Sequence, residues 1–300
     1  MVTMRRPWTT RVAESLRHRA EASEAVVIVA ISVGLLIGLS LGALGGGGSI
    51  LTVPALVYLL GMDTRAATTG SLIVVGITAV FGMLAHRRDG HVRVLQGVVF
   101  GALGAAGAVV GTRLSMSVPP DVLLAGFSGL MLAVAAVMLA RSSSRIPAGG
   151  APGVADSLPF DVPIITFTPR FVCACPRAAK VLIAALVVGL MTRFFGVGGG
   201  FLVVPALVLV LDFPMPVAVG TSLLVIAINS GTSLIARAGN GIEINWTVIG
   251  LFTAAAVIGS LLGARIATRA RPETLRIAFA ALIIAVGLYT AARSIPALFG

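Results

Sequence analysis

The chain has 300 residues, of which 57% are hydrophobic and only 11% are charged. Because about a quarter of the residues in soluble domains are charged, this composition excludes a soluble globular protein. The net charge of +11 would suggest nucleic-acid binding if it formed one patch. The arginines lie instead in short connections between apolar runs, which favours membrane surfaces and the cytoplasmic side, with no nucleic acid as partner.

Residues 1–24 are expected to form an N-terminal tail in the cytoplasm or on the membrane surface. The apolar stretch that follows is too long for the core of a cleavable signal peptide. From Ala25 to Met62 there is no Asp, Glu, Lys or Arg, and further uncharged runs follow along the chain. About 20 apolar residues are enough for a helix to cross the bilayer. The sequence therefore predicts an all-α polytopic membrane protein.

A glycine-rich segment that ends in a proline occurs twice. Residues 42–56 read GALGGGGSILTVPAL and residues 193–207 read RFFGVGGGFLVVPAL, with identity at eight of fifteen positions. Glycine clusters interrupt the helical hydrogen bonds, and inside a membrane such backbone is tolerated only where protein buries it or a wet cavity adjoins it. Two matched breaks therefore predict a transporter binding site.

The duplication extends beyond this motif. At the same shift of 151 residues Ser71 matches Ser222, Ala85 matches Ala236 and Gly90 matches Gly241, and at a shift of 152 Gly107 matches Gly259 and Arg113 matches Arg265. The sequence thus predicts two homologous transmembrane repeats, 25–140 and 179–293, an extramembrane linker at 141–178 and a C-terminal tail at 294–300. Each repeat is expected to contain a glycine-broken helix followed by three transmembrane helices.

The helical pieces are expected at about 25–44, 48–60, 67–86, 93–113 and 121–140 in the first repeat, and at about 179–195, 200–211, 215–236, 245–266 and 273–293 in the second. Pro54 and Pro205 follow the breaks closely enough to predict a kink. The alternating pattern of Val162–Cys175 in the linker favours a small β-hairpin. Cys173 and Cys175 have no histidine nearby and no second cysteine pair, so no metal site is predicted.

Topology depends on the broken stretches. If each crosses the membrane once, the repeats are parallel, and if each folds back as a hairpin, the repeats are inverted. Both arrangements place the loop from Arg87 to Arg93 and the central linker in the cytoplasm. Only the hairpin arrangement also places Arg265, Arg269, Arg271 and Arg276 there. Inverted repeats with broken helices are a common transporter plan, so inverted repeats are expected.

The glycine clusters leave backbone amides without helical partners at the start of a helix, which is a natural site for an anion. The candidates are Gly45, Gly46, Gly47, Gly48, Gly196, Gly198, Gly199 and Gly200. The alternative role for these glycines is close helix packing by small residues. Arg193 precedes the second cluster inside an apolar environment and is the candidate for a bidentate oxyanion contact, or else an arginine that reaches to the interface.

Polar uncharged residues follow the breaks and complete the predicted anion site. The candidates are Ser71, Thr221, Ser222 and Asn229. Their alternative role is hydrogen bonding to their own helix backbone. All eleven acidic residues fall outside the expected hydrocarbon core, so a cation substrate and coupling through a buried carboxylate are disfavoured. No enzyme motif occurs, none of the three histidines lies deep in an apolar run, and no cofactor is predicted.

The doubled motif G-x-G-G-[GS]-x-L-x-V-P-A-L, together with Gly111–Arg113 and Gly263–Arg265, resembles the TauE/SafE sulfite-exporter family, also called the four-toluene-sulfonate uptake permease family. Arg193 and its neighbours depart from the small and aliphatic residues expected there. The resemblance implies a permease of a bacterial-type inner membrane that moves sulfite, a sulfonate or a related small anion. An anion-selective channel is the alternative. The expected partners are the anionic substrate and the lipid bilayer. The sequence leaves open whether the chain forms a homo-oligomer.

Overall fold

The computed structural model describes residues 27–115, 120–143, 175–194, 200–237 and 245–299. All regular elements in these residues are helices, which confirms the all-α class. In the described part of the chain, five helices are long and apolar enough to cross a membrane. They are Val27–Leu44, Arg65–Arg88, Met215–Arg237, Trp246–Arg269 and Pro272–Ala292.

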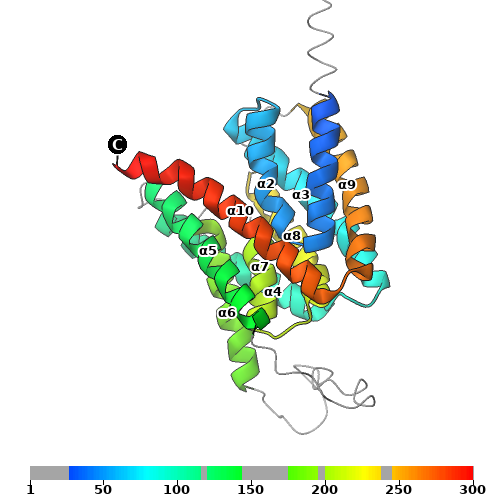
Figure 1. Cartoon of the computed structure of the whole chain (residues 1–300), viewed down its shortest axis with the longest axis vertical. Coiled ribbons are helices and arrows are strands. Elements are labelled where there is room, and N and C mark those ends of the chain that lie inside the picture. The colour runs from blue at the N-terminus through cyan, green and yellow to red at the C-terminus, as the bar shows by residue number, and fades with distance from the viewer. Residues whose placement is uncertain (1–26, 116–119, 144–174, 195–199, 238–244, 300) are drawn as a thin grey trace, which may run out of the picture.

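The helices follow the order expected from the two repeats (Figure 1). The first repeat contains the first helix (Val27–Leu44), α2 (Gly47–Pro54), the π-helix η1 (Ala55–Leu59), α3 (Thr64–Arg88), α4 (Val94–Ser115) and α5 (Pro120–Ser143). The second contains α6 (Cys175–Phe194), α7 (Gly200–Leu209), α8 (Met215–Arg237), α9 (Trp246–Arg269) and α10 (Pro272–Phe299). Residues 144–174, with most of the proposed hairpin and Cys173, lie outside the described residues.

Local sequence signals fix several helix ends. The Asp63 carboxylate accepts a hydrogen bond from the Arg65 amide at 2.9 Å and so caps the start of α3. The Asn245 side chain accepts one from the Val248 amide at 3.3 Å at the start of α9. Both side chains satisfy an amide that has no partner within the helix. Gly90, with a φ of 73°, follows α3 in the left-handed conformation that glycine adopts readily.

The first glycine cluster reverses the direction of the chain. Gly45 has a φ of 70°, and α2 then runs back along the first helix. A Cβ atom on Gly48 would lie 2.6 Å from the Leu41 nitrogen and 2.7 Å from the Ile37 carbonyl oxygen. A helix that continued straight on would carry Gly48 away from both residues, because each residue adds 1.5 Å of length. The first helix and α2 therefore form a hairpin.

The helix after this turn changes its hydrogen-bond pattern at Pro54. Proline has no N–H with which to continue the α-helical ladder. The next residues form the π-helix η1, in which the Leu60 amide donates to the Ala55 carbonyl oxygen at 3.3 Å. A single widened turn of this kind is typical of functional regions in helices. In the second repeat, residues 195–199 of the corresponding break lie outside the described residues.

The first helix of each repeat packs against a helix of the other repeat. The backbone of Gly38 in the first helix contacts the backbone of Ala256 in α9, and at the equivalent positions Gly189 in α6 contacts Gly104 in α4. Small residues allow these close approaches. Two further large interfaces join equivalent helices, α3 with α8 and α5 with α10, and the α3–α9 interface corresponds to the α4–α8 interface. The contact pattern therefore keeps its form when the repeats are interchanged, as expected for a pseudo-twofold axis.

The equivalent helices α3 and α8 run in opposite directions. At one end of the α3–α8 pair, an Arg237 N–H donates to the Thr68 hydroxyl at 3.1 Å. At the other end, a Cβ atom on Gly220 would lie 3.1 Å from the His86 Cβ atom. The last turn of each helix thus meets the first turns of its partner. Large apolar side chains are exposed around the helices, among them Leu36, Ile235, Ile258 and Leu288, which suits contact with lipid tails.

Candidate functional site

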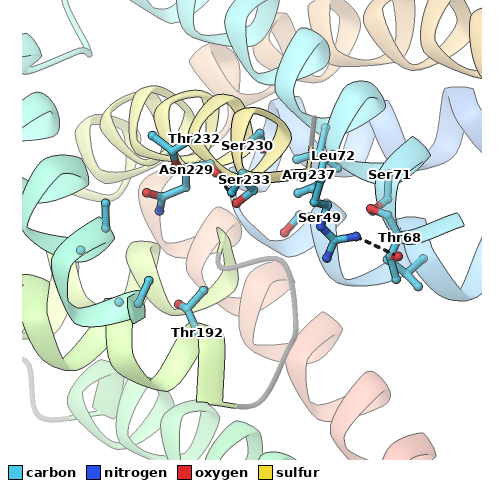
Figure 2. Close-up of a pocket in the computed structure, with 17 residues that line it drawn as sticks. Ser49, Thr68, Ser71, Leu72, Thr192, Asn229, Ser230, Thr232, Ser233 and Arg237 are labelled. Atoms are coloured by element: carbon cyan, nitrogen blue, oxygen red, sulfur yellow. Dashed lines mark hydrogen bonds between the residues drawn. The ribbon is translucent and has the colours of Figure 1, made fainter. Parts of the chain in front are cut away.

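A cavity of about 550 Å³ lies between α3, α4, α6 and α8, beside the start of α2. Helices of both repeats form its wall. Its described polar residues are Ser49, Thr68, Ser71, Thr192, Asn229, Ser230, Thr232, Ser233 and Arg237, and Figure 2 shows them around one space. A volume of a few hundred Å³ is typical of small-molecule sites.

Arg237 supplies the positive charge of this cavity. It is the last residue of α8, is half-buried, and donates hydrogen bonds to the hydroxyls of Thr68 at 3.1 Å and Thr69 at 3.2 Å. In Figure 2 its guanidinium points across to Thr68 on α3. Among the described residues that line the cavity, Arg237 is the charged one, and none is a carboxylate. The cavity therefore favours a negatively charged ligand.

Sequence reasoning did not single out Arg237. The residue ends an uncharged run and so resembles an ordinary arginine at a helix terminus. A signal was present in the repeat, because Arg237 follows Ala236 directly and Ala236 matches Ala85. Arg237 is therefore equivalent to His86, and both repeats place a nitrogen-bearing side chain at the end of their second long helix.

Two of the predicted polar residues, Ser71 and Asn229, lie in the cavity wall. The Ser71 hydroxyl donates to the Thr68 carbonyl oxygen at 2.8 Å, and the Ser233 hydroxyl donates to the Asn229 carbonyl oxygen at 2.6 Å. A serine must turn its proton away from the helix backbone before it can donate to a ligand. The Asn229 side chain has two N–H donors in a fixed amide plane, and it points into the space in Figure 2.

Two other predicted residues lie away from the described cavity wall. The Thr221 hydroxyl oxygen accepts a hydrogen bond from the Arg93 amide at 3.1 Å. The Ser222 hydroxyl donates to the Val219 carbonyl oxygen at 2.8 Å, and both side chains are fully buried. Arg193 follows the cavity residue Thr192 in the last turn of α6, and its side chain lies outside the described part of the structure.

The described glycines of the two clusters make close backbone contacts. A Cβ atom on Gly46 would overlap the carbonyl group of Gly200, and one on Gly200 would lie 2.7 Å from the Ser49 hydroxyl oxygen. The starts of α2 and α7 therefore meet at the centre of the protein. Gly47 faces Leu282 of α10, while Gly45 forms the turn beside Ser222. In this region the cavity wall includes Ser49, and Gly196, Gly198 and Gly199 lie outside the described residues.

His86 is buried more deeply than its place near the end of an apolar run indicates. Its side chain is 0% exposed, and its Nε2–H donates to the Gly42 carbonyl oxygen at 2.9 Å, just before the hairpin turn. The Nδ1 atom is buried without a hydrogen-bond partner. His86 thus ties the end of α3 to the end of the first helix.

Comparison with known proteins identifies the family. The family described as sulfite exporter TauE/SafE matches residues 30–290, which include the hairpin turn, the cavity and most of both predicted repeats. The chain belongs to this family. The expected resemblance is thereby confirmed, and the TauE/SafE family is one of membrane transporters.

Individual TauE/SafE relatives agree with this assignment. A protein of Xylella fastidiosa (strain Temecula1) described as a probable membrane transporter protein is 32% identical over 271 residues, covering 89% of this chain and 96% of the relative. The probable membrane transporter protein YunE of Bacillus subtilis (strain 168) is 26% identical over 267 residues, covering 87% and 95%. No solved structure matches the chain.

Proposed function

We propose that the chain is a secondary carrier for a small oxyanion, such as sulfite or a sulfonate, in a bacterial-type inner membrane. The cavity between α3, α4, α6 and α8 is the substrate site. The observation that carries this proposal is the Arg237 guanidinium at a cavity whose described lining residues include hydroxyls and an amide but no carboxylate. In a low-dielectric interior, such a charge strongly favours an anion over a neutral or cationic solute.

The substrate contacts follow from the geometry. The guanidinium offers a planar fork of N–H donors that matches two oxygens of a sulfite or sulfonate group. Asn229 and, after rotation of their hydroxyls, Thr68 and Ser71 donate further hydrogen bonds. Arg193 remains a second candidate cation, because its neighbour Thr192 lines the same cavity. The amides of the second glycine cluster are proposed to border the site next to Gly200.

We infer that the repeats are inverted in the membrane. The antiparallel packing of α3 and α8 and the hairpin of the first helix and α2 support this arrangement. A Cβ atom on Gly70 of α3 would meet Ile249 of α9, and one on Gly82 would meet Ser260, so α3 and α9 run parallel and end on the same side. The basic residues at those ends are Arg87, Arg88, Arg265 and Arg269. Positive charge is retained in the cytoplasm, so this end faces inward.

The cavity then faces outward. Thr68 and Arg237 are partly exposed at the far end of α3 and α8, whereas His86 and Thr78 toward the cytoplasmic end are fully buried. A carrier needs access from one side at a time, as the two repeats rock around a central site. A channel needs a continuous path, so the burial of the described residues at the His86 end favours a carrier.

Flux through purified protein in liposomes tests this proposal. Vesicles loaded with sulfite, methanesulfonate, sulfoacetate or acetate would be diluted into medium with a radiolabelled trace of the same anion. A carrier accumulates label by counterflow, and the initial rate saturates with concentration. Protein-free vesicles and vesicles with Arg237→Gln serve as controls. Absence of protein-dependent flux for all four anions would reject the proposal, and flux without saturation or counterflow would favour the channel.

A further inference from the structure

We propose that His86 is the second anion-contacting residue of this site and lines the cavity when it opens at the cytoplasmic end of α3 and α8. The proposal rests on the proposed carrier function and extends it to the state in which the outer end is closed. Arg237 then contacts the oxyanion when the cavity is open to the outside, and His86 contacts the same oxyanion when the cavity is open to the inside.

The repeat makes His86 and Arg237 equivalent. Ala85 matches Ala236 and Gly90 matches Gly241 at a shift of 151 residues, and this shift carries His86 onto Arg237. The structure repeats the correspondence in space. Arg237 donates to the Thr69 hydroxyl on α3, and His86 packs against Gly220 on α8, the residue equivalent to Thr69. Each side chain therefore closes the same helix pair at opposite ends.

Other cavity residues have buried equivalents around His86. Asn229 lines the cavity, and its equivalent Thr78 is 1% exposed with a hydroxyl that has no hydrogen-bond partner. Ser71 lines the cavity, and its equivalent Ser222 is 0% exposed. Both serines donate to the carbonyl oxygen three residues earlier, so their local geometry is the same in the two repeats. A polar surface equivalent to the cavity wall thus exists inside the closed end.

Among the buried polar atoms of the described residues that lack a hydrogen-bond partner are the Thr78 hydroxyl oxygen and the His86 Nδ1 atom, both in this closed end. Groups of this kind are rare in native proteins, and each asks for an explanation. Opening of the inner end supplies one, because both atoms would then meet water or the substrate. Apolar side chains would fill the closed end without leaving such groups unpaired.

The change of state follows from exchange of the two repeat conformations. When α3 and α8 close at Arg237 and part at His86, the imidazole leaves the Gly42 carbonyl oxygen. Its Nε2–H, which now donates to that oxygen, becomes free to donate to the anion. Release of this contact also frees the end of the first helix, so motion of the hairpin accompanies opening.

Cysteine accessibility tests the opening without knowledge of the substrate. In a chain with Cys173→Ser and Cys175→Ser, His86→Cys is expected to react with an impermeant thiol reagent applied to the face that carries Arg87 and Arg88. Ala280→Cys is the control, because Ala280 on α10 is also 0% exposed and does not line the cavity. Reaction at position 86 but not 280 supports the proposal, and protection of both overturns it. Should His86→Cys fail to insert, Thr78→Cys gives the same readout.

Sulfite flux separates this proposal from the carrier function. His86→Gln should raise the half-saturation concentration on the inner face about tenfold while leaving the outer value within about twofold, and Arg237→Gln should do the reverse. His86→Arg should restore much of the inner affinity. Equal effects of His86→Gln on both faces, or none, would overturn the proposal while the carrier function stands. If the wild-type chain moves no anion, the carrier function fails, and labelling at position 86 still decides whether this end opens.

Discussion

Gly104 on α4 and Gly189 on α6 touch backbone to backbone, and no side chain fits between them. The equivalent pair, Ala256 on α9 and Gly38 on the first helix, makes the same contact. The first helix of each repeat therefore packs on the other repeat. We call the two interfaces, first helix–α9 and α4–α6, the seams. The stability of the folded protein depends on both seams, since van der Waals packing drives helix association in lipid.

Substitution in one seam should destabilise the protein. A Cβ atom on Gly259 of α9 would overlap the Leu35 carbonyl oxygen, so Gly259→Ala should cost about 1–3 kcal/mol through overpacking. The midpoint of thermal unfolding in detergent should fall accordingly. Gly250→Ala in the same helix is the control, because no atom lies within 4 Å of its Cβ position. An equal midpoint for both variants would show that the seam tolerates a methyl group.

The hairpin turn should be sensitive at Gly45. Its φ of 70° costs an alanine about 1–2 kcal/mol, and the new Cβ would also lie 2.5 Å from the Ser222 hydroxyl oxygen. Gly61→Ala is a matched control, since its φ is 63° and nothing lies within 4 Å. We expect Gly45→Ala to lower the unfolding midpoint more than Gly61→Ala does. Equal shifts would mean that backbone strain alone matters at the turn.

Arg237 should set the affinity for the anion on the outer face. A hydrogen bond from a charged group contributes about 1.5–3 kcal/mol, so Arg237→Gln should weaken binding by about tenfold to a hundredfold. Arg237→Lys should recover part of this, because it keeps the charge but loses the planar fork. Half-saturation concentrations in liposomes give the measurement. Arg65→Gln, an exposed arginine at the same end of α3, should leave the value near wild type.

Arg193 allows a competing assignment of the cation. If its guanidinium binds the anion, Arg193→Gln should weaken affinity at least as much as Arg237→Gln, and Arg193→Lys should weaken it by roughly 1–3 kcal/mol. If it reaches to the interface instead, both variants should change expression and not affinity. The same flux assay distinguishes these results, and wild-type affinity for Arg193→Gln would remove Arg193 from the site.

Labelling of single introduced cysteines should show that the two repeats have opposite orientations in the membrane. Thr247 at the start of α9 and Thr268 at its end are exposed, as is Asp89 after α3. In a chain with Cys173→Ser and Cys175→Ser, an impermeant reagent outside the cell should label Thr247→Cys and leave Thr268→Cys and Asp89→Cys unlabelled. Labelling of Thr268→Cys from outside, with Asp89→Cys protected, would favour parallel repeats.

The sequence predicted the helix order and the duplication, because uncharged runs and matched glycines are local signals. It also placed Ser71 and Asn229 in a polar wall that the structure brings together. It did not predict that the first helix packs on α9 and α6 on α4. A sequence repeat shows which positions are equivalent, but it does not show which helix faces are in contact. Arg237 was missed for the same reason: at a helix end it resembles any interfacial arginine, and only the packing of α8 on α3 directs it into the cavity.

The described glycines illustrate a second limit. Glycine clusters in a membrane predict both exposed amides and close helix contact, and sequence alone does not separate these roles. Gly46 and Gly48 make the close contacts, whereas Ser49, the first turns of α3 and the last turns of α8 provide the polar groups of the cavity. The sequence therefore predicted polar groups beside the first break, where the structure has a cavity, and the anion site itself stays a prediction.

The pairing of the first helix with α9 has a consequence for how the protein is made. The first helix leaves the ribosome early, yet its close backbone partner is the second-last helix to be synthesised. Until α9 is inserted, the groove of small residues on the first helix has only lipid to contact. Final assembly must therefore wait until synthesis is nearly complete, and a chain truncated before α9 should insert without reaching the compact, protease-resistant state.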